Sequence, residues 1–200
     1  MHSSYLIYKP FGMLSQFSRE TPTQQTLADL SQDFAKNVYP VGRLDADSEG
    51  LLLLSSDTSL TDKLLNPKHA HSRTYWVQVE QIPTPEALVQ LQTGLEISIN
   101  GKLHKTLPCK ARLLDTTVTD FLPERHPPIR YRANIPTAWL EIQLTEGKNR
   151  QVRRMTAAIG FPTLRLVRVA IGGLHLAHLS LASGDCLLLN PNQIGLLYNN

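Results

Sequence analysis

A run of charged residues that ends in four leucines constrains this chain most strongly. Residues 42–50 read Gly-Arg-Leu-Asp-Ala-Asp-Ser-Glu-Gly, and four leucines follow at 51–54. A short apolar run after a turn signal predicts a buried strand. Carboxylates beside a core need partners, because an unpaired buried carboxylate is costly and takes up a proton instead. We therefore expect a functional site at the mouth of a sheet, with one of the acids held ionised.

Size and composition indicate an ordinary globular protein. The 200 residues are 42% hydrophobic and 18% charged, which suits one large domain or two subdomains that share a core. The longest aliphatic run is too short to span a membrane, and the start of the chain lacks the regions of a signal peptide, so we expect a cytoplasmic protein. Cys109 and Cys186 lie far apart with no CxxC motif, which argues against a disulfide scaffold or a zinc site.

Charge is distributed unevenly along the chain. Residues 1–100 carry 7 Lys and Arg against 11 Asp and Glu, whereas residues 101–200 carry 13 against 6. Within the second half, a basic cluster has Glu146 as the only nearby acid. Its members are Lys148, Arg150, Arg153, Arg154, Arg165 and Arg168. Lys and Arg gain affinity by displacing counterions from phosphates, so nucleic acid is the leading candidate partner.

Short strands and short helices alternate along the chain. Periodicity and capping residues predict strands at 5–8, 51–54, 73–80, 139–144 and 164–171, and helices at 57–66, 84–94 and 148–160. A proline-rich basic loop is expected at 123–137. Strands far apart in sequence must pair around these helices, so we expect an α+β fold with a mixed, mostly antiparallel sheet. We expect one domain over 1–200, with subdomains at 1–65 plus 145–200 and at 73–140.

The acidic loop alone permits several readings. Asp45, Asp47, Glu49 and Gly50 match positions 1, 3, 5 and 6 of an EF-hand loop, but position 12 is Ser56 and a strand follows, so calcium binding is disfavoured. A glycosidase-like pair of acids would need a fixed separation that one short loop does not establish. A solvated acidic turn is the ordinary interpretation of such a loop. Arg43 suggests ion pairing or a nucleic-acid contact.

Residues 146–155 form a second candidate site. Helical spacing places Arg150, Arg153 and Arg154 on one side and core residues on the other. Exposed N–H groups at the start of this helix, near Lys148 and Asn149, suit a phosphate. We expect a structural helix whose outer face contacts RNA or DNA.

Two further residues lie on predicted strands. Alternation places Arg168 among apolar neighbours, where a guanidinium needs a carboxylate such as Asp45, unless it reaches solvent at the strand end. Tyr75 shares a face with two valines, which is typical of a core aromatic. The histidine pairs of this chain lack an evident third ligand, so no metal site is predicted.

Taken in order, these motifs resemble one family. They are Lys9-Pro10, the 42–54 stretch, Arg73-Thr74-Tyr75, the 146–155 stretch, and Leu166-x-Arg168 with Ile171-Gly172. This set resembles the bacterial rRNA pseudouridine synthases of the small-subunit synthase A family, and within it the large-subunit synthase E branch. That branch lacks the N-terminal S4-like domain, and this chain starts at the catalytic strand. The resemblance implies the pseudouridine synthase fold, with two subdomains around a central cleft.

The resemblance also implies roles for single residues. Asp45 is the expected catalytic aspartate, Tyr75 the active-site tyrosine, and Arg168 the basic partner of Asp45. Leu166 would pack beside the tyrosine and the base. Arg43 would contact RNA at the flipped nucleotide. Lys148, Asn149, Arg150, Arg153 and Arg154 complete the expected RNA-binding set.

The implied reaction converts a uridine of large-subunit (23S) rRNA into pseudouridine. It is an isomerisation that transfers no electrons, so neither a redox cofactor nor a metal is expected. The expected partner is large-subunit rRNA, free or in an assembling subunit, bound by a monomer away from membranes. The main alternative is a non-catalytic RNA-binding module of the same fold. A calcium- or glycan-directed protein that uses the acidic loop is a third hypothesis.

Overall fold

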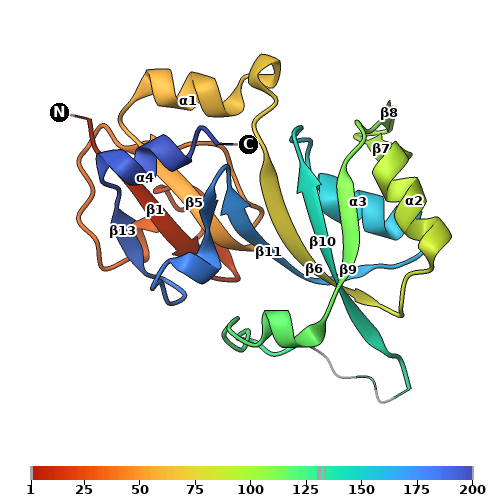
Figure 1. Cartoon of the computed structure of the whole chain (residues 1–200). Coiled ribbons are helices and arrows are strands. Elements are labelled where there is room, and N and C mark those ends of the chain that lie inside the picture. The colour runs from red at the N-terminus through yellow and green to blue at the C-terminus, as the bar shows by residue number, and fades with distance from the viewer. Residues whose placement is uncertain (1, 130–131, 133, 200) are drawn as a thin grey trace. The chain divides into compact units, whose positions relative to one another are not determined.

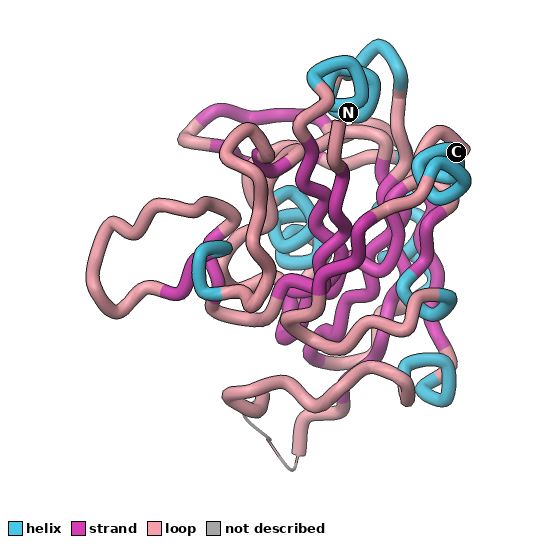
Figure 2. The backbone as a smooth tube through the Cα atoms, turned by 90° about the vertical axis from the view of Figure 1, so that its left-hand side faces the viewer, coloured by secondary structure: helices cyan, strands magenta, loops and turns pink. Residues whose placement is uncertain are grey.

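The structure is a computed structural model that describes residues 2–129, 132 and 134–199. The chain divides into two compact units (Figure 1). Unit 1 comprises Met1–His71 and Val167–Asn200, and unit 2 comprises Ser72–Leu166. Strands and loops make up most of the chain, and the helices are short (Figure 2).

Unit 1 is built on strands in the order β13-β1-β5-β11. Their bounds are β1 (Ser4–Lys9), β5 (Glu49–Ser55), β11 (Thr163–Ile171) and β13 (Cys186–Leu188), and two-residue strands β4 (Tyr39–Pro40) and β12 (Leu174–His175) extend this sheet. All these pairings are antiparallel except that of β5 with β11, which is parallel and sets Gly50 opposite Arg168. The unit also contains a separate pair, β2 (Met13–Leu14) with β3 (Gln25–Thr26), and the helices α1 (Thr58–Leu65), α4 (Pro191–Leu196), η1 (Leu27–Asp29), η2 (Pro67–His69) and η4 (Leu176–His178).

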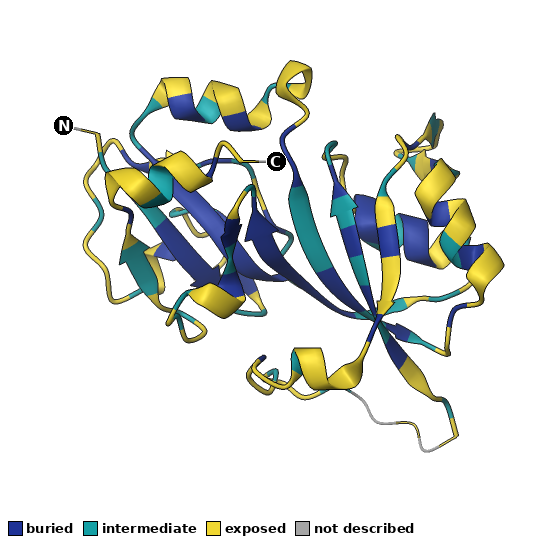
Figure 3. Ribbon diagram, in the orientation of Figure 1, coloured by how far each residue is buried: buried dark blue, intermediate teal, exposed yellow. Residues whose placement is uncertain are grey.

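Strand β5 is buried along its whole length, as Figure 3 shows by its dark blue ribbon. The four leucines at 51–54 are each no more than 1% exposed. Side chains alternate across a strand, so burial of every residue means that both faces of β5 are covered. The predicted buried strand behind the acidic loop is therefore confirmed, and it extends two residues into the loop to include Glu49 and Gly50.

Unit 2 contains strands in the order β6-β10-β9, with the first residues of β11 beside β6. The strands are β6 (Arg73–Glu80), β9 (Lys110–Leu114) and β10 (Thr137–Leu144), and a separate hairpin joins β7 (Glu96–Ile99) to β8 (Lys102–Lys105). Helices α2 (Pro85–Thr93), α3 (Gln151–Ala158) and η3 (Thr116–Thr119) complete the unit. One apolar cluster joins inner positions of β6, β10, α2 and α3, and it includes Val77, Leu91, Leu140 and Met155.

The predicted helices that carry strong caps match the structure closely. Asp57 accepts hydrogen bonds from the backbone N–H groups of Ser59 and Leu60 and so begins α1. Thr84 caps α2, with Pro85 at its first position and Gly94 after its last residue. The mixed, mostly antiparallel sheet and the α+β class are confirmed as well.

Two boundaries differ from the sequence-based expectation. Helix α3 begins at Gln151 and not near Lys148, because Arg150 adopts a left-handed conformation (φ 51°) that a helix cannot continue through. Residues 145–166 belong to unit 2, whereas we expected them beside the N-terminal part. The reason is that Val152 and Met155 of α3 pack into the core of unit 2. The predicted basic loop falls partly on Arg130, which lies outside the described residues.

No helix in the described part of the chain is long and apolar enough to cross a membrane.

Candidate active site

The acidic loop that carries Asp45 lies in unit 1 and leads into β5. The N–H of Ser48 donates to the carbonyl oxygen of Asp45 at 3.0 Å, which closes a tight turn around residues 46 and 47. Leu44 is buried and Asp45 is half-buried. The residue before Asp45 is therefore buried, whereas Asp45 itself is partly exposed to solvent.

Two contacts fix the backbone on either side of Asp45. On the amino-terminal side, the buried hydroxyl of Ser15 donates to the carbonyl oxygen of Leu44 at 2.8 Å and accepts from its N–H at 3.0 Å. On the other side, the N–H of Gly12 donates to the carbonyl oxygen of Ala46 at 2.7 Å. Because residues 44 and 46 are both held, the position of Asp45 is determined by the segment that follows β1.

Lys9 supports the same loop from the interior. Its side chain is fully buried, and its ammonium group donates to the carbonyl oxygens of Pro10 at 2.8 Å, Met13 at 2.7 Å and Ala46 at 3.4 Å. Burial lowers the pKa of Lys9 to about 7, although the carboxylates of Glu49, Asp47 and Asp45 act in the opposite direction. The family resemblance includes Lys9 but implies no contact between its side chain and the acidic loop. The available signal was a lysine at the end of an otherwise apolar strand.

Arg168 lies on β11 directly beside the start of β5. It is 4% exposed, so the alternative in which it reaches solvent is wrong. Its Nε donates to the carbonyl oxygen of Leu51 at 2.6 Å. Its buried Nη2 has no hydrogen-bond partner among the described residues. A carbonyl oxygen is a direct partner of this guanidinium, and the pairing of Arg168 with Asp45 stays a prediction.

The other charged residues of the loop differ in their surroundings. Arg43 is exposed and Asp47 is half-buried. Glu49 is only 3% exposed, because it already belongs to β5 and lies opposite Val167 of β11. The interpretation of the loop as a solvated acidic turn is therefore wrong for Glu49.

Tyr75 and Leu166 belong to unit 2. Tyr75 lies on β6 and packs, partly buried, against the apolar cluster that contains Leu166, Val77 and Val79. The prediction that Tyr75 shares a face with the two valines is confirmed. Leu166, 5% exposed, is a member of the same cluster, and its packing beside the tyrosine and the base stays a prediction.

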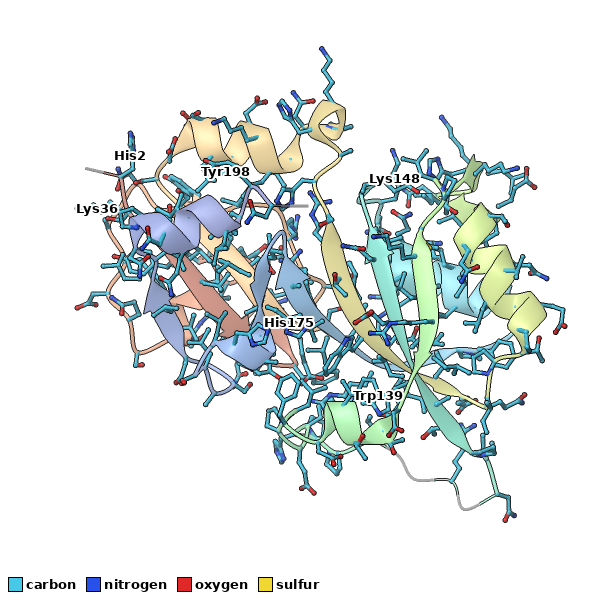
Figure 4. All side chains as sticks on the ribbon, in the orientation of Figure 1. His2, Lys36, Trp139, Lys148, His175 and Tyr198 are labelled. Atoms are coloured by element: carbon cyan, nitrogen blue, oxygen red, sulfur yellow. The ribbon has the colours of Figure 1, made fainter. Side chains whose placement is uncertain are left out.

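Residues 146–150 form an exposed turn ahead of α3. Lys148, labelled in Figure 4, Asn149 and Arg150 all have exposed side chains. The N–H of Lys148, one of those expected to face a phosphate, donates to Oε1 of Gln151 at 2.9 Å. Phosphate binding at this turn stays a prediction.

The two arginines of α3 are half-buried. Arg154 donates from Nε to the carbonyl oxygen of Asn149 at 3.1 Å, from Nη2 to Oδ1 of Asn149 at 3.3 Å, and from Nη1 to the carbonyl oxygen of Ser98 at 2.5 Å. Three of its five N–H groups are thus used inside unit 2. Arg153 has its Nε at a buried position on the same helix. Arg154 orients Asn149, which lies at the exposed end of the turn.

A metal site was sought among the described residues. They contain no group of three or more His, Cys, Asp or Glu side chains arranged to hold a metal ion. The acidic loop does not continue as an EF-hand either, because β5 occupies the place where the exiting helix would begin.

The fold is that of the pseudouridylate synthases, as the comparisons with known proteins show. Residues 3–158 match the family model described as RNA pseudouridylate synthase. The chain therefore belongs to the RNA pseudouridylate synthase family. Its members are RNA isomerases, and the chain is accordingly an enzyme of that class.

Several curated proteins of this family are similar to the chain. It is 52% identical over 168 residues to the ribosomal large subunit pseudouridine synthase E of Xanthomonas axonopodis pv. citri, and this alignment covers 84% of each chain. It is 49% identical to the synthase of the same name from Vibrio parahaemolyticus, over 86% of this chain and 68% of that one. Ribosomal large subunit pseudouridine synthase B of Bacillus subtilis is 33% identical, over 95% of this chain and 69% of that one.

A solved structure supports the fold assignment. A crystal structure of a pseudouridylate synthase superposes with a TM-score of 0.77, covers 98% of this chain and 74% of its own, and is 23% identical in sequence. This likeness establishes the fold alone.

Proposed function

We propose that this protein isomerises a specific uridine of large-subunit rRNA to pseudouridine, with Asp45 as the catalytic residue. The observation that carries the proposal is the anchoring of Asp45. Ser15 and Gly12 hold the residues on both sides of it, while its own side chain stays half-buried at the loop. A carboxylate that reacts at one sugar carbon needs such a fixed backbone, because a small displacement of the reacting group strongly lowers the reaction rate. The names of the relatives support rRNA as the substrate.

The reaction breaks the N1–C1′ bond of uridine and forms a C5–C1′ bond in its place. The carboxylate of Asp45 either attacks C1′ or removes a sugar proton, and in both cases it must be ionised. Uracil then turns over while still bound, C5 joins C1′, and the C5 proton is lost to a base as N1 takes up a proton. Atoms and electrons balance without any co-reactant.

Tyr75 and Arg168 assist this chemistry in different ways. We assign Tyr75 to the removal of the C5 proton, directly or through water, and Leu166 to packing beside the tyrosine and the base. Arg168 contributes its positive charge near the loop, since it acts electrostatically on Lys9 together with Asp45 and Glu49. Its hydrogen bond to Leu51 fixes that charge at the start of β5.

RNA binding precedes catalysis, because the target nucleotide must leave its stack to reach the carboxylate. Extrusion of a base costs a few kcal/mol, which phosphate contacts offset. We assign these contacts to the exposed side chains of Arg43, Lys148, Asn149 and Arg150, with Arg153 and Arg154 behind them. The affinity of such contacts falls steeply as salt rises.

The biological setting follows from the substrate. We propose that the enzyme acts as a monomer. Large-subunit rRNA of bacteria is made and assembled in the cytoplasm, so we place the enzyme there. Activity on a free rRNA transcript, compared with activity on immature large-subunit particles, distinguishes the two forms of substrate.

The test of the proposal is Asp45→Asn. The amide keeps the size of the side chain but cannot act as nucleophile or base, so pseudouridine formation on 23S rRNA is expected to fall by at least a thousandfold. RNA binding, measured by filter retention, is expected to stay within a few-fold of the wild type. Asp47→Asn is the matched control and should keep its activity. Unchanged turnover in Asp45→Asn would refute the assignment of Asp45, and a wild type without turnover would favour a non-catalytic RNA-binding module.

A further inference from the structure

The hairpin formed by β7 and β8 in unit 2 has no role in the function described so far. Its strands are joined by Asn100 and Gly101, which both have positive φ angles (49° and 78°), as the tight turn of a two-residue hairpin requires. At its base, the N–H of Leu95 donates to the hydroxyl of Thr106, and the N–H of Thr106 donates to the carbonyl oxygen of Leu95. The hairpin is thus a well-defined element.

Apart from Glu96 at its first position, the charged residues of the hairpin are basic. No Asp or Glu occurs from residue 97 to residue 114, a stretch that contains Lys102, Lys105, Lys110 and Arg112. Arg112 is neutralised by Glu141 at 2.8 Å. The three lysines are exposed and make no ion pair among the described residues. Lys105 makes none even though Glu96 lies opposite it in the hairpin.

The hairpin is also tied to the turn that precedes α3. Ring nitrogen Nε2 of His104, on β8, lies 3.2 Å from Oε2 of Glu146, and the N–H of Leu107 donates to Oε1 of the same carboxylate at 2.7 Å. From the other strand, the carbonyl oxygen of Ser98 accepts from Arg154. Figures 1 and 4 show the hairpin and Lys148 at the same end of unit 2. The lysines of the hairpin therefore lie on the same rigid element as the exposed turn 146–150.

We propose that Lys102 and Lys105 bind backbone phosphates of the RNA substrate, next to those bound by the turn 146–150. The proposal rests on the proposed function, since it extends the RNA-binding surface of that enzyme. RNA is favoured as the occupant because these lysines make no ion pair among the described residues, because the hairpin is bonded to the turn that carries Lys148 and Arg150, and because the family acts on RNA. Contacts of this kind give affinity and position the substrate without selecting its sequence.

The experiment compares two charge reversals of equal size. The variant Lys102→Glu with Lys105→Glu changes the hairpin, and Lys36→Glu with Lys68→Glu changes two exposed lysines of unit 1 by the same net charge. Binding to a 23S rRNA transcript is measured by filter retention between about 50 and 200 mM salt. The hairpin variant is expected to bind at least tenfold more weakly. Its slope of log affinity against log salt should be shallower by about 1.5, since each phosphate contact contributes roughly 0.7 to 0.9.

Further readings separate the possible causes. Lys102→Gln with Lys105→Gln should weaken binding by an intermediate amount, and thermal unfolding should confirm that all variants are folded. In turnover assays the loss should appear in KM and exceed that of the unit 1 control. Equal effects of the hairpin variant and the control on affinity and slope would overturn the proposal. Weaker binding to large-subunit particles but not to the transcript would also overturn it, in favour of an acidic ribosomal protein.

The proposed function and this inference fail in different ways. If the wild type forms no pseudouridine in rRNA, the function is refuted, while filter retention still decides whether the hairpin binds RNA. If the wild type is active and the hairpin variant binds like the control, only the inference is refuted.

Discussion

The hydroxyl of Ser15 hydrogen-bonds to both polar groups of the Leu44 backbone, donating to the carbonyl oxygen and accepting from the N–H. The two residues are 29 positions apart, so this pair fastens the acidic loop to the segment after β1. Gly12 from the same segment and Lys9 at the end of β1 donate hydrogen bonds to the carbonyl oxygen of Ala46. The proposed catalytic residue Asp45 therefore lies between two anchored neighbours.

Replacing Ser15 with alanine tests this anchoring. The change leaves the buried N–H and carbonyl of Leu44 without their partner, and the free energy of unfolding should fall by about 1–3 kcal/mol. Because Asp45 follows Leu44 directly, kcat should fall on the order of tenfold or more. Turnover on rRNA and denaturant unfolding measure the two effects.

Ser4→Ala is the matched control. The hydroxyl of Ser4 makes a buried hydrogen bond of 2.8 Å to that of Ser55, in the same unit but with no contact to the acidic loop. Ser4→Ala should lose stability while its kcat stays near that of the wild type. An equal loss of kcat in both variants would mean that Ser15 acts only through stability.

Gly50 marks a second constraint, at the point where the loop enters β5. Its φ is +102°, and a β-carbon there would lie 2.3 Å from the carbonyl oxygen of Arg168. Gly50→Ala must therefore push β11 away from β5, and we expect roughly 3 kcal/mol or more of destabilisation. Denaturant unfolding measures this loss.

Gly184→Ala is a control that measures the cost of the backbone conformation without a close approach between strands. Gly184 also has a positive φ (+94°), but no atom lies within 4 Å of its would-be β-carbon. Its substitution should cost only about 1–2 kcal/mol, the penalty of the left-handed conformation. Equal costs for the two glycines would show that β5 and β11 tolerate separation.

Sequence patterns predicted the parts of the fold that depend on local interactions. Caps at Asp57 and Thr84 gave helix starts that the structure confirms, since capping depends on residues two or three positions away. The leucines at 51–54 predicted a buried strand because apolar composition alone defines it. The family resemblance added the roles of single residues, which remain predictions for Asp45, Tyr75 and Arg168.

These sequence patterns did not predict interactions between residues that lie far apart in the chain. Nothing near Lys9 in the sequence indicates that its ammonium group contacts Ala46, 37 positions away. Glu49 is buried because it lies opposite β11, which comes more than 100 residues later in the chain. The left-handed Arg150 shortened α3, because helical periodicity does not report a single backbone angle.

Glu146 gives a prediction for unit 2. Its Oε1 accepts from Leu107 N–H and from Gln151 Nε2 at 2.6 Å, and its Oε2 lies next to His104. In Glu146→Gln an amide NH2 replaces one carboxylate oxygen and faces either the two N–H donors or the ring of His104, and the negative charge that strengthens these bonds is lost, so stability should fall by about 1–3 kcal/mol. The turn 146–150 and the hairpin lose their common anchor, and KM for rRNA should rise several-fold.

The direction of this change is informative, because removal of a negative charge would by itself strengthen RNA binding. Glu124→Gln, an exposed acid elsewhere in unit 2, removes the same charge and should leave KM equal or lower. If Glu146→Gln behaves like Glu124→Gln in KM, the network does not position the RNA-binding surface.

Lys9 predicts a pH dependence of stability. Burial lowers its pKa to about 7, the carboxylates of Glu49, Asp47 and Asp45 raise it, and Arg168 lowers it. The unfolded chain, with an ordinary lysine pKa near 10.4, binds this proton up to a higher pH than the folded protein does. Stability from this group therefore increases as pH rises above about 7, by up to about 1.4 kcal/mol per pH unit.

Lys9→Met isolates this contribution, since the other titrating groups are shared with the wild type. The free energy of unfolding of wild type minus that of Lys9→Met, measured in urea from pH 6 to pH 9.5, should increase with pH. Lys68→Met, at an exposed lysine, should give a difference that does not change over this range. A flat difference for Lys9→Met would mean that the three carbonyl oxygens around the ammonium group keep it charged in the folded protein.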